Sequence, residues 1–292
     1  MSCGATLALA DETVSSVCTY CASALVDVKR AAAVIDRVAP FRVPRAAAEA
    51  SLRDHLVRAF WAPEVLRRGA RRRTLHAHEL RGVLVPFHAY RATVRGRWRA
   101  RVGLGWSRTE TRVRNGERQT QVVWETEWFP IDGTLVDELE EHLVSASAGL
   151  RAAELRGLFP FDLGRARPFD PHLVAGWNAE LPTRTRDAVD RAALAEIREL
   201  EARRLRKWLL PGDAHEIEAL HADVTLHGVD LVLLPIWVAT YRQGERVYRL
   251  LVNGQTGRCC GRPPISGVKV SLAAAALAAL VVFVLWATGV VP

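Results

Sequence analysis

LLPIWVATYRQGERVYRLLVNGQTG, residues 233–257, is the stretch that most strongly indicates the fold of this chain. Its first half is apolar and rich in strand-forming residues up to Gly244, and its second half returns through apolar residues to Val252. Two such runs separated by a turn containing glycine are typical of a β-hairpin. Asn253 and Gly254 follow, and both residue types tolerate a positive φ, so we expect a tight turn directly after the hairpin.

An earlier segment has a similar design. In that segment a proline lies ten residues before Gly96, whereas in the later one Pro235 lies nine residues before Gly244. Apolar and aromatic residues precede each glycine and continue after it. The sequence therefore predicts two related hairpins in one sheet, near residues 83–102 and 231–252.

Helical spacing of apolar residues marks three further segments. They are residues 45–61, Leu135–Leu143 and Thr185–Trp208. The first has an apolar face made of Leu52, Leu56, Phe60 and Trp61, and the third has one made of Val189, Ala193, Ile197 and Leu200. Each face recurs at the spacing of one helical turn, so we expect amphipathic helices that cover the sheet.

The residues between the two hairpins predict more strands. Trp106, Trp124 and Trp128 lie on these strands. Tryptophans on hairpins pack in a core or against the opposite strand more often than they stack on nucleic-acid bases. The sequence as a whole predicts an α+β fold with an antiparallel, hairpin-rich body and one long helix.

The carboxyl-terminal run VSLAAAALAALVVFVLWATGVVP, residues 270–292, contains no ionisable side chain. About twenty apolar residues suffice for a helix to cross the roughly 30 Å hydrocarbon core of a bilayer. The pattern therefore predicts a single transmembrane helix over residues 268–291; a helix buried in a soluble core is the alternative.

The flanks of this run predict its orientation. Arg258, Arg262 and Lys269 precede it, and no basic residue follows it. The positive-inside rule then predicts a tail-anchored protein of the cytoplasmic (inner) membrane, with the bulk of the chain in the cytoplasm and the lipid bilayer as a partner. An exported body is the alternative topology.

Three cysteines near the amino terminus predict a metal site. Cys18 and Cys21 form a Cys-x-x-Cys pair, and Cys3 precedes them. A structural zinc site needs four ligands in tetrahedral geometry, and two such pairs commonly supply them. We therefore predict a partial zinc ribbon over residues 1–27, with Zn as the cofactor. Its fourth ligand is expected just upstream of Met1; a degenerate ribbon without this ligand is the alternative. An amino-terminal tail with incidental cysteines is the alternative.

A linker over residues 28–44 and the α+β body over residues 45–267 complete the expected domain organisation. Pro40 and Pro44 disfavour helix in the linker, and Pro44 suits the start of the helix that follows.

The charge of the chain predicts an acidic partner. The formal net charge is +8, and of the 40 basic residues only three are lysine. Five arginines, Arg67, Arg68, Arg71, Arg72 and Arg73, form the densest basic cluster. A solvated surface, anionic lipid headgroups and nucleic acid are the three alternatives for this cluster.

The motifs of common catalytic sites are missing from the sequence. No glycine precedes a lysine, so the Gly-Lys-Ser/Thr loop of an ATP-driven motor is absent. His76, His78 and His215 lack the His-Glu-x-x-His spacing, and neither Ser145 nor Ser147 lies in a nucleophile elbow. We therefore expect a protein that is not an enzyme.

Several of these stretches together resemble a known family. They are PFRVPRAAAEASLRDHLVRAFWAP, LRGVLVPFHAYRATV, TEWFPIDG with LVSAS, FDLGRARPFDPHLVAGW and LLPIWVATYRQGERVYRLLVNGQTG. The family consists of bacterial membrane proteins with an amino-terminal zinc ribbon of the transcription-factor-IIB type, often labelled primosomal protein N-prime or superfamily II helicase-like. The resemblance covers roughly residues 1–270 and implies a membrane-tethered zinc-ribbon protein that serves as a scaffold in envelope organisation or stress response.

Two leading functional hypotheses follow from the sequence, and an enzyme with an unrecognised site is a third, held in reserve. The first is an adaptor or scaffold that binds another protein at the membrane. The second is a membrane-held nucleic-acid-binding protein that uses the ribbon and the arginine cluster, and it predicts an affinity that falls steeply with salt.

Overall fold

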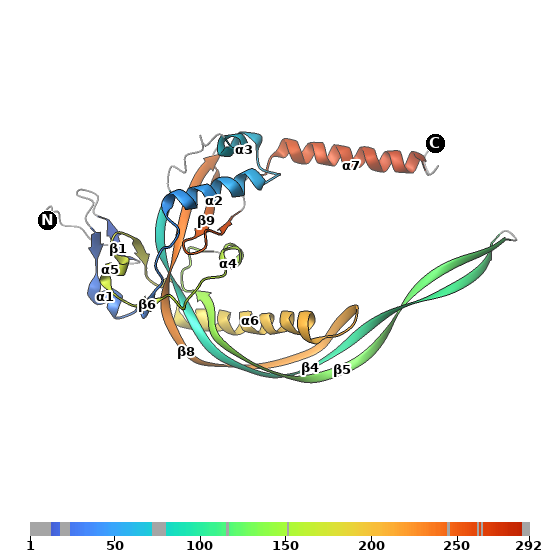
Figure 1. Cartoon of the computed structure of the whole chain (residues 1–292), viewed down its shortest axis with the longest axis horizontal. Coiled ribbons are helices and arrows are strands. Elements are labelled where there is room, and N and C mark those ends of the chain that lie inside the picture. The colour runs from blue at the N-terminus through green and yellow to red at the C-terminus, as the bar shows by residue number, and fades with distance from the viewer. Residues whose placement is uncertain are drawn as a thin grey trace. The chain divides into compact units, whose positions relative to one another are not determined.

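A computed structural model describes residues 13–17, 24–71, 80–114, 117–150, 152–243, 246–261, 263 and 265–287 (Figure 1). The strands are β1 (Thr13–Val17), β2 (Ala24–Val26), β3 (Arg37–Val38), β4 (Arg81–Arg114), β5 (Glu117–Ser145), β6 (Arg167–Pro168), β7 (Asn178–Glu180), β8 (Ala214–Gln243), β9 (Arg246–Asn253) and β10 (Cys259–Cys260). The helices are α1 (Val28–Ala32), α2 (Arg45–Arg58), α3 (Glu64–Arg71), α4 (Ala152–Leu158), α5 (Pro171–Val174), α6 (Arg186–Arg204), the π-helical turn η1 (Leu205–Leu209) and α7 (Gly267–Ala287).

The fold is α+β, and its sheet is mixed. Seven strands follow the order β10-β9-β8-β4-β7-β1-β2, with β5 paired to β4 and β3 paired to both β8 and β6. Most described pairs are antiparallel, but β3 runs parallel to β8 and β7 runs parallel to β4. These two parallel pairs depart from the purely antiparallel sheet that the sequence predicts, because short strands far from their partners in sequence enter the sheet.

The chain divides into two compact units, and the boundary falls within β4 and β8. Unit 1 comprises residues 1–87, 147–183 and 231–292, and unit 2 comprises residues 88–146 and 184–230.

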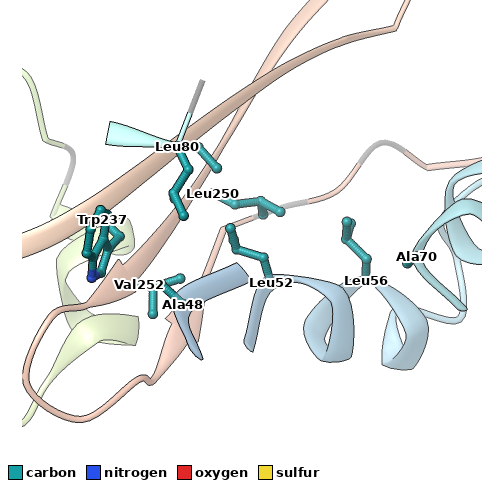
Figure 2. Close-up of a cluster of buried hydrophobic side chains, with 9 residues drawn as sticks. Ala48, Leu52, Leu56, Ala70, Leu80, Trp237, Leu250 and Val252 are labelled. Carbon is teal, nitrogen blue, oxygen red and sulfur yellow. The ribbon is translucent and has the colours of Figure 1, made fainter. Parts of the chain in front are cut away.

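Unit 1 is built on the hairpin of β8 and β9. The two strands pair antiparallel from Ile236 opposite Asn253 to Gln243 opposite Arg246. Their apolar residues on one face pack against α2, and Figure 2 shows this cluster of Ala48, Leu52, Leu56, Ala70, Leu80, Trp237, Ala239, Leu250 and Val252. Helix α2 contributes Ala48, Leu52 and Leu56 at one-turn spacing, as the sequence pattern indicates. Phe60 and Trp61, which the sequence places on the same face, follow the end of α2 and are exposed.

The turn after β9 is organised by the side chain of Asn253, which is fully buried. Its Nδ2 atom donates to the carbonyl oxygens of Leu158 and Pro160, both at 2.9 Å. Its Oδ1 atom accepts from the backbone nitrogens of Gln255 at 2.8 Å and Thr256 at 3.0 Å. Because both ends of the amide are satisfied, the turn is tied to the segment that follows α4.

Unit 2 is built on long stretches of β4, β5 and β8, with α6 against them. Val189, Ala193 and Ile197 form the buried stripe of α6, and Ile197 packs with Ala92 and Leu135 of the strands. In η1, Leu205 packs against a second cluster that contains Ala100, Val102 and Leu210. The long helix therefore lies where the sequence pattern predicts it, with its last turn formed as a π-helix.

Two sequence predictions in this region are wrong. Residues 81–114 form one continuous strand, so no hairpin turns at Gly96. A Cβ atom at position 96 would lie 2.3 Å from the carbonyl oxygen of His221, so this glycine permits a close approach of β8 rather than a turn. Residues Leu135–Leu143 belong to β5 and not to a helix, because burial alternates with a period of two, with every second side chain from Thr134 to Glu140 exposed.

The predicted transmembrane helix, and with it the tail-anchored location in the inner membrane, is also a prediction that the structure corrects. Helix α7 includes Lys269 in its first turn, where the ammonium donates to the carbonyl oxygens of Phe60 and Ala62. Over the residues with a described placement, no helix has the length and apolarity that a membrane span requires.

Candidate protein-binding arm

The three residues predicted to bind zinc, Cys3, Cys18 and Cys21, lie outside the described residues. Within the described ranges no group of three or more histidine, cysteine or acidic side chains is arranged to hold a metal ion. Cys259 and Cys260 are adjacent on β10, and the Cys260 thiol donates to the carbonyl oxygen of Glu154 at 3.1 Å. The predicted zinc ribbon therefore has no support in the described part of the chain.

Both of these cysteines are poor nucleophiles. Burial, together with the neighbouring Cys260, raises the pKa of Cys259 to about 12. Burial and the nearby Glu154 carboxylate raise the pKa of Cys260 to about 11. Because the thiolate is the reactive form, both side chains are expected to react slowly near neutral pH.

Unit 2 contains a two-stranded ribbon made of residues 103–114 of β4 and residues 117–130 of β5, here called the arm. The arm carries six large apolar side chains that are exposed to solvent: Leu104, Trp106, Val122, Trp124, Trp128 and Phe129. Trp124 is the most exposed of the three tryptophans, at 76%, followed by Trp106 at 43% and Trp128 at 37%. Contiguous exposed apolar side chains of this kind mark interaction sites.

Both faces of the arm carry these side chains. Contacts around Gly103 include Thr126 and Trp128, so the even-numbered residues of β5 share a face with the odd-numbered residues of β4. Trp124 and Trp128 therefore lie on one face, and Trp106 and Phe129 lie on the other. Neither face of the arm is therefore fully covered by the core of unit 2.

Charged side chains fix the conformation of the arm. The guanidinium of Arg108 on β4 lies 2.8 Å from the Glu125 carboxylate on β5 and 2.7 Å from that of Glu110. The guanidinium of Arg101 lies 5.6 Å from the centre of the Trp128 ring, a cation–π contact. The Arg108–Glu125 ion pair and the Arg101–Trp128 contact join the two strands of the ribbon.

The base of the arm is fastened to the start of β8. The backbone nitrogen of Asp213 donates to the carbonyl oxygen of Gly103, and its carboxylate accepts from the backbone nitrogen of Gly105 at 3.0 Å. Glycine is required at position 103 because a Cβ atom there would lie 2.6 Å from the Thr126 side chain.

The sequence places the arm tryptophans on strands but favours a core or cross-strand role for them, and their exposure was missed. The composition of the sequence around these tryptophans nevertheless indicates that they are exposed. Between Trp106 and Trp124 the sequence is mainly Ser, Thr, Arg, Glu and Gln, so it offers no third apolar strand or helix that would cover both faces.

The basic cluster is partly neutralised by acidic neighbours. Arg67 is only 17% exposed, and its guanidinium lies 3.1 Å from the Glu64 carboxylate. Partial burial acts to raise the pKa of Glu64, but the charges of Arg67, Lys269, Arg71 and Arg68 outweigh it and lower that pKa. Arg72 and Arg73 lie outside the described residues. In the described part of the cluster, Arg67 and Arg68 thus pair with Glu64 within α3, while the side chains of Arg68 and Arg71 remain exposed to solvent.

The polar residues that the sequence offered as catalytic candidates do not form a catalytic constellation in the described structure. His76, His78 and Glu79 lie outside the described residues, and the His215 ring bonds the carbonyl oxygen of Pro211 at 2.8 Å. The Ser147 hydroxyl donates to the Glu180 carboxylate at 3.1 Å.

A polar triad in unit 2 has a structural role. Buried Tyr90 donates to the Asp190 carboxylate at 2.5 Å, and Arg186 donates to the same oxygen at 2.7 Å. Burial and the hydrogen bond to Asp190 raise the pKa of Tyr90. Burial acts to raise the pKa of Asp190, but the hydrogen bonds from Tyr90 and Arg186 outweigh it and lower that pKa. The triad fastens α6 to β4.

Comparison with known proteins gives one distant relative. The chain is 23% identical over 235 residues to the uncharacterized protein YdjG of Bacillus subtilis (strain 168). The aligned region covers 80% of this chain and spans 65% of the length of the relative. No protein-family model matches the chain, and no solved structure matches it.

Proposed function

We propose that this protein is a non-enzymatic adaptor that binds another protein through the arm. The proposal keeps the scaffold role that the family resemblance implies, without its membrane tether or its zinc ribbon. The observation that carries it is the exposure of Trp106, Trp124 and Trp128 on the two faces of the arm, where Leu104, Val122 and Phe129 are exposed as well.

The exposed area on these three side chains is large enough to matter for binding. If a whole tryptophan side chain presents about 250 Å², the exposed fractions leave roughly 400 Å² on the three together. One partner contributes about 800 Å² to an interface of standard size. A bound protein that covers both faces of the arm would thus bury tryptophan area equal to about half of the contribution of one partner. Tryptophan is among the residue types most enriched at binding hot spots.

The nucleic-acid hypothesis has less support. Its sequence argument rests on the arginine cluster, and Arg67 and Arg68 each pair with Glu64. On the arm, Arg108 is likewise paired with acidic side chains. Binding to phosphates would require these ion pairs to open.

A photo-crosslinking experiment tests the proposal. The photoreactive residue p-benzoylphenylalanine replaces Thr126, which shares its face of the arm with Trp124, in the full chain produced in its native host. We expect a crosslink to one defined protein, identified by mass spectrometry. The double change Trp106→Thr with Trp124→Thr should reduce its yield at least tenfold, because it removes the hot-spot side chains while keeping strand-forming residues.

Trp61→Thr is the matched control, because Trp61 is 46% exposed and lies outside the arm. Its crosslink yield should equal that of the unaltered arm. A crosslink to DNA or RNA that disappears with nuclease, or a yield that the double change leaves intact, would contradict the adaptor proposal.

A further inference from the structure

We infer that unit 1 carries a surface that binds reversibly to an anionic lipid bilayer from one side, with no helix crossing it. The surface consists of the junction between α2 and α3 together with residues 265–269, where α7 begins, and is here called the lipid-facing patch. It combines exposed apolar side chains with exposed cations, namely Phe60, Trp61, Val65, Ile265 and Val268 with Arg68 and Arg71.

Hydrogen bonds join the two segments of the patch. The backbone nitrogen of Ser266 donates to the carbonyl oxygen of Trp61 at 2.8 Å. The Lys269 ammonium donates to the carbonyl oxygens of Phe60 at 2.7 Å and Ala62 at 2.9 Å, and it lies 5.3 Å from the centre of the Phe60 ring. Figure 1 likewise shows α3 beside the start of α7. The apolar side chains on the two segments therefore belong to one surface.

The apolar side chains of the patch project into solvent. Val65 is 82% exposed, and Val268, Ile265 and Phe60 each expose more than three fifths of their surface. The Trp61 ring packs edge-on against Phe60, with 5.3 Å between the ring centres. Side chains that project in this way suit insertion between lipid headgroups, where aromatic rings are typically found, better than they suit a groove for a partner helix.

The charges around the patch do not cancel. Glu64 is the only acidic residue of α3, and cationic nitrogens of Arg67, Arg68 and Lys269 lie 3.1, 3.6 and 3.7 Å from its carboxylate. Arg71 also acts electrostatically on this carboxylate. Four cations and one carboxylate leave an excess of three positive charges beside the apolar side chains.

Helix α2 adds to this excess. Its arginines are Arg45, Arg53 and Arg58, and its two acidic residues, Glu49 and Asp54, already pair with them. A negatively charged bilayer attracts net positive charge over roughly a Debye length, about 10 Å at 0.1 M salt. The ion pairs with Glu64 therefore need not open for this attraction to act.

The apolar side chains favour a bilayer over nucleic acid as the anionic partner. A phosphate backbone would engage only the cations and leave Val65, Ile265 and Val268 in water. A bilayer engages both parts of the patch, because the headgroups attract the cations and the region beneath them accepts the apolar side chains.

Flotation of the full chain with lipid vesicles tests this inference. We expect at least tenfold tighter binding to vesicles of three parts phosphatidylcholine to one part phosphatidylglycerol than to vesicles of phosphatidylcholine alone. Raising the salt from about 0.1 M to about 0.5 M should release most of the bound protein, because the attraction is screened. Equal binding to both kinds of vesicle, no binding to the anionic ones, or binding that salt leaves intact would overturn the inference.

A charge variant locates the surface. Arg68→Gln with Arg71→Gln should weaken binding to the anionic vesicles about twentyfold, since each basic residue near such a bilayer contributes roughly a factor of five. Arg203→Gln with Arg206→Gln is the matched control, because it removes the same charge from exposed positions of unit 2. Its affinity should stay within about twofold of the original. Equal weakening by the two double changes would show that net charge alone drives binding, and would refute the patch.

An apolar variant tests insertion. Phe60→Ser with Trp61→Ser should weaken vesicle binding at least tenfold, because it removes exposed apolar surface while keeping the backbone carbonyls that hold Lys269. Unchanged binding in this variant, or tighter binding of the original chain to duplex DNA than to anionic vesicles at the same salt, would contradict the inference.

The vesicle experiments and the crosslinking experiment fail separately. The double change Trp106→Thr with Trp124→Thr should leave vesicle binding unchanged, because the arm belongs to unit 2. A missing crosslink with intact vesicle binding contradicts only the adaptor proposal. Missing vesicle binding with an intact crosslink overturns only the lipid-facing patch.

Discussion

Among the acidic residues that the structure describes, Glu201 is the most deeply buried. It occupies the core face of α6, one helical turn after Ile197, and is only 1% exposed. Its carboxylate accepts from Arg204 at 3.0 Å, and the same guanidinium also pairs with Asp137 of β5. Burial, and then the adjacent Asp137, raise the pKa of Glu201 above its ordinary value of 4.5, against the opposing charge of Arg204. The native state therefore holds a proton that the unfolded chain releases more readily.

The raised pKa of Glu201 predicts a pH dependence of stability. Because the native state binds more protons, the contribution of this group is favourable below pH 4.5 and is lost as pH rises through its native pKa. Glu201→Gln removes the titration while keeping an acceptor for Arg204. We expect the free energy of unfolding, measured by urea titration, to decrease less between pH 4.5 and pH 7.5 in this variant than in the original chain.

Glu199→Gln is the control for this experiment, since Glu199 is 57% exposed on the same helix and pairs with Arg203. Its pH profile should match that of the original chain. A uniform loss of stability at both pH values in Glu201→Gln would show that the native carboxyl is ionised, contrary to the prediction.

At the scale of elements, the sequence is most informative where burial is one-sided. Helix α2 has a single apolar face, and its periodicity indicates both the type of element and its core residues. Leu135–Leu143 was misassigned because Leu135, Leu139 and Leu143 also fit helical spacing. The alternation of β5 becomes decisive only when pairing with β4 is known.

The packing of α2 on β8 and β9 predicts the effect of a core substitution. Leu52 is 4% exposed within the cluster of Figure 2, so Leu52→Ala should leave a cavity and lower the free energy of unfolding by about 2–5 kcal/mol. Val65→Ala on α3 removes apolar carbon from a side chain that is 82% exposed, and should change the free energy by less than about 0.5 kcal/mol. Urea unfolding at constant pH measures both. A loss below about 1 kcal/mol for Leu52→Ala would be inconsistent with this packing.

At the scale of the whole molecule, the sequence predicts the α+β class but misses several features that depend on distant contacts. The parallel pairs of β3 with β8 and β7 with β4 join segments far apart in the chain, and local pattern carries no information on such pairing. The arm tryptophans were missed for a related reason: a strand with aromatic side chains looks the same in sequence whether or not another layer covers it.

The adjacent thiols of Cys259 and Cys260 on β10 allow local unfolding of unit 1 to be measured by alkylation. At pH 8, a thiol with a pKa of about 12 is ionised to roughly one part in ten thousand, so iodoacetamide has almost nothing to attack while β10 stays in place. In a chain with Cys3, Cys18 and Cys21 replaced by serine, alkylation of Cys259 and Cys260 should be slowed at least a hundredfold relative to the same chain in urea. The alkylation rate that remains in the folded chain would then report how often this part of unit 1 unfolds locally, without any dye or added label. Alkylation as fast as in urea would mean that this strand is not held in its place.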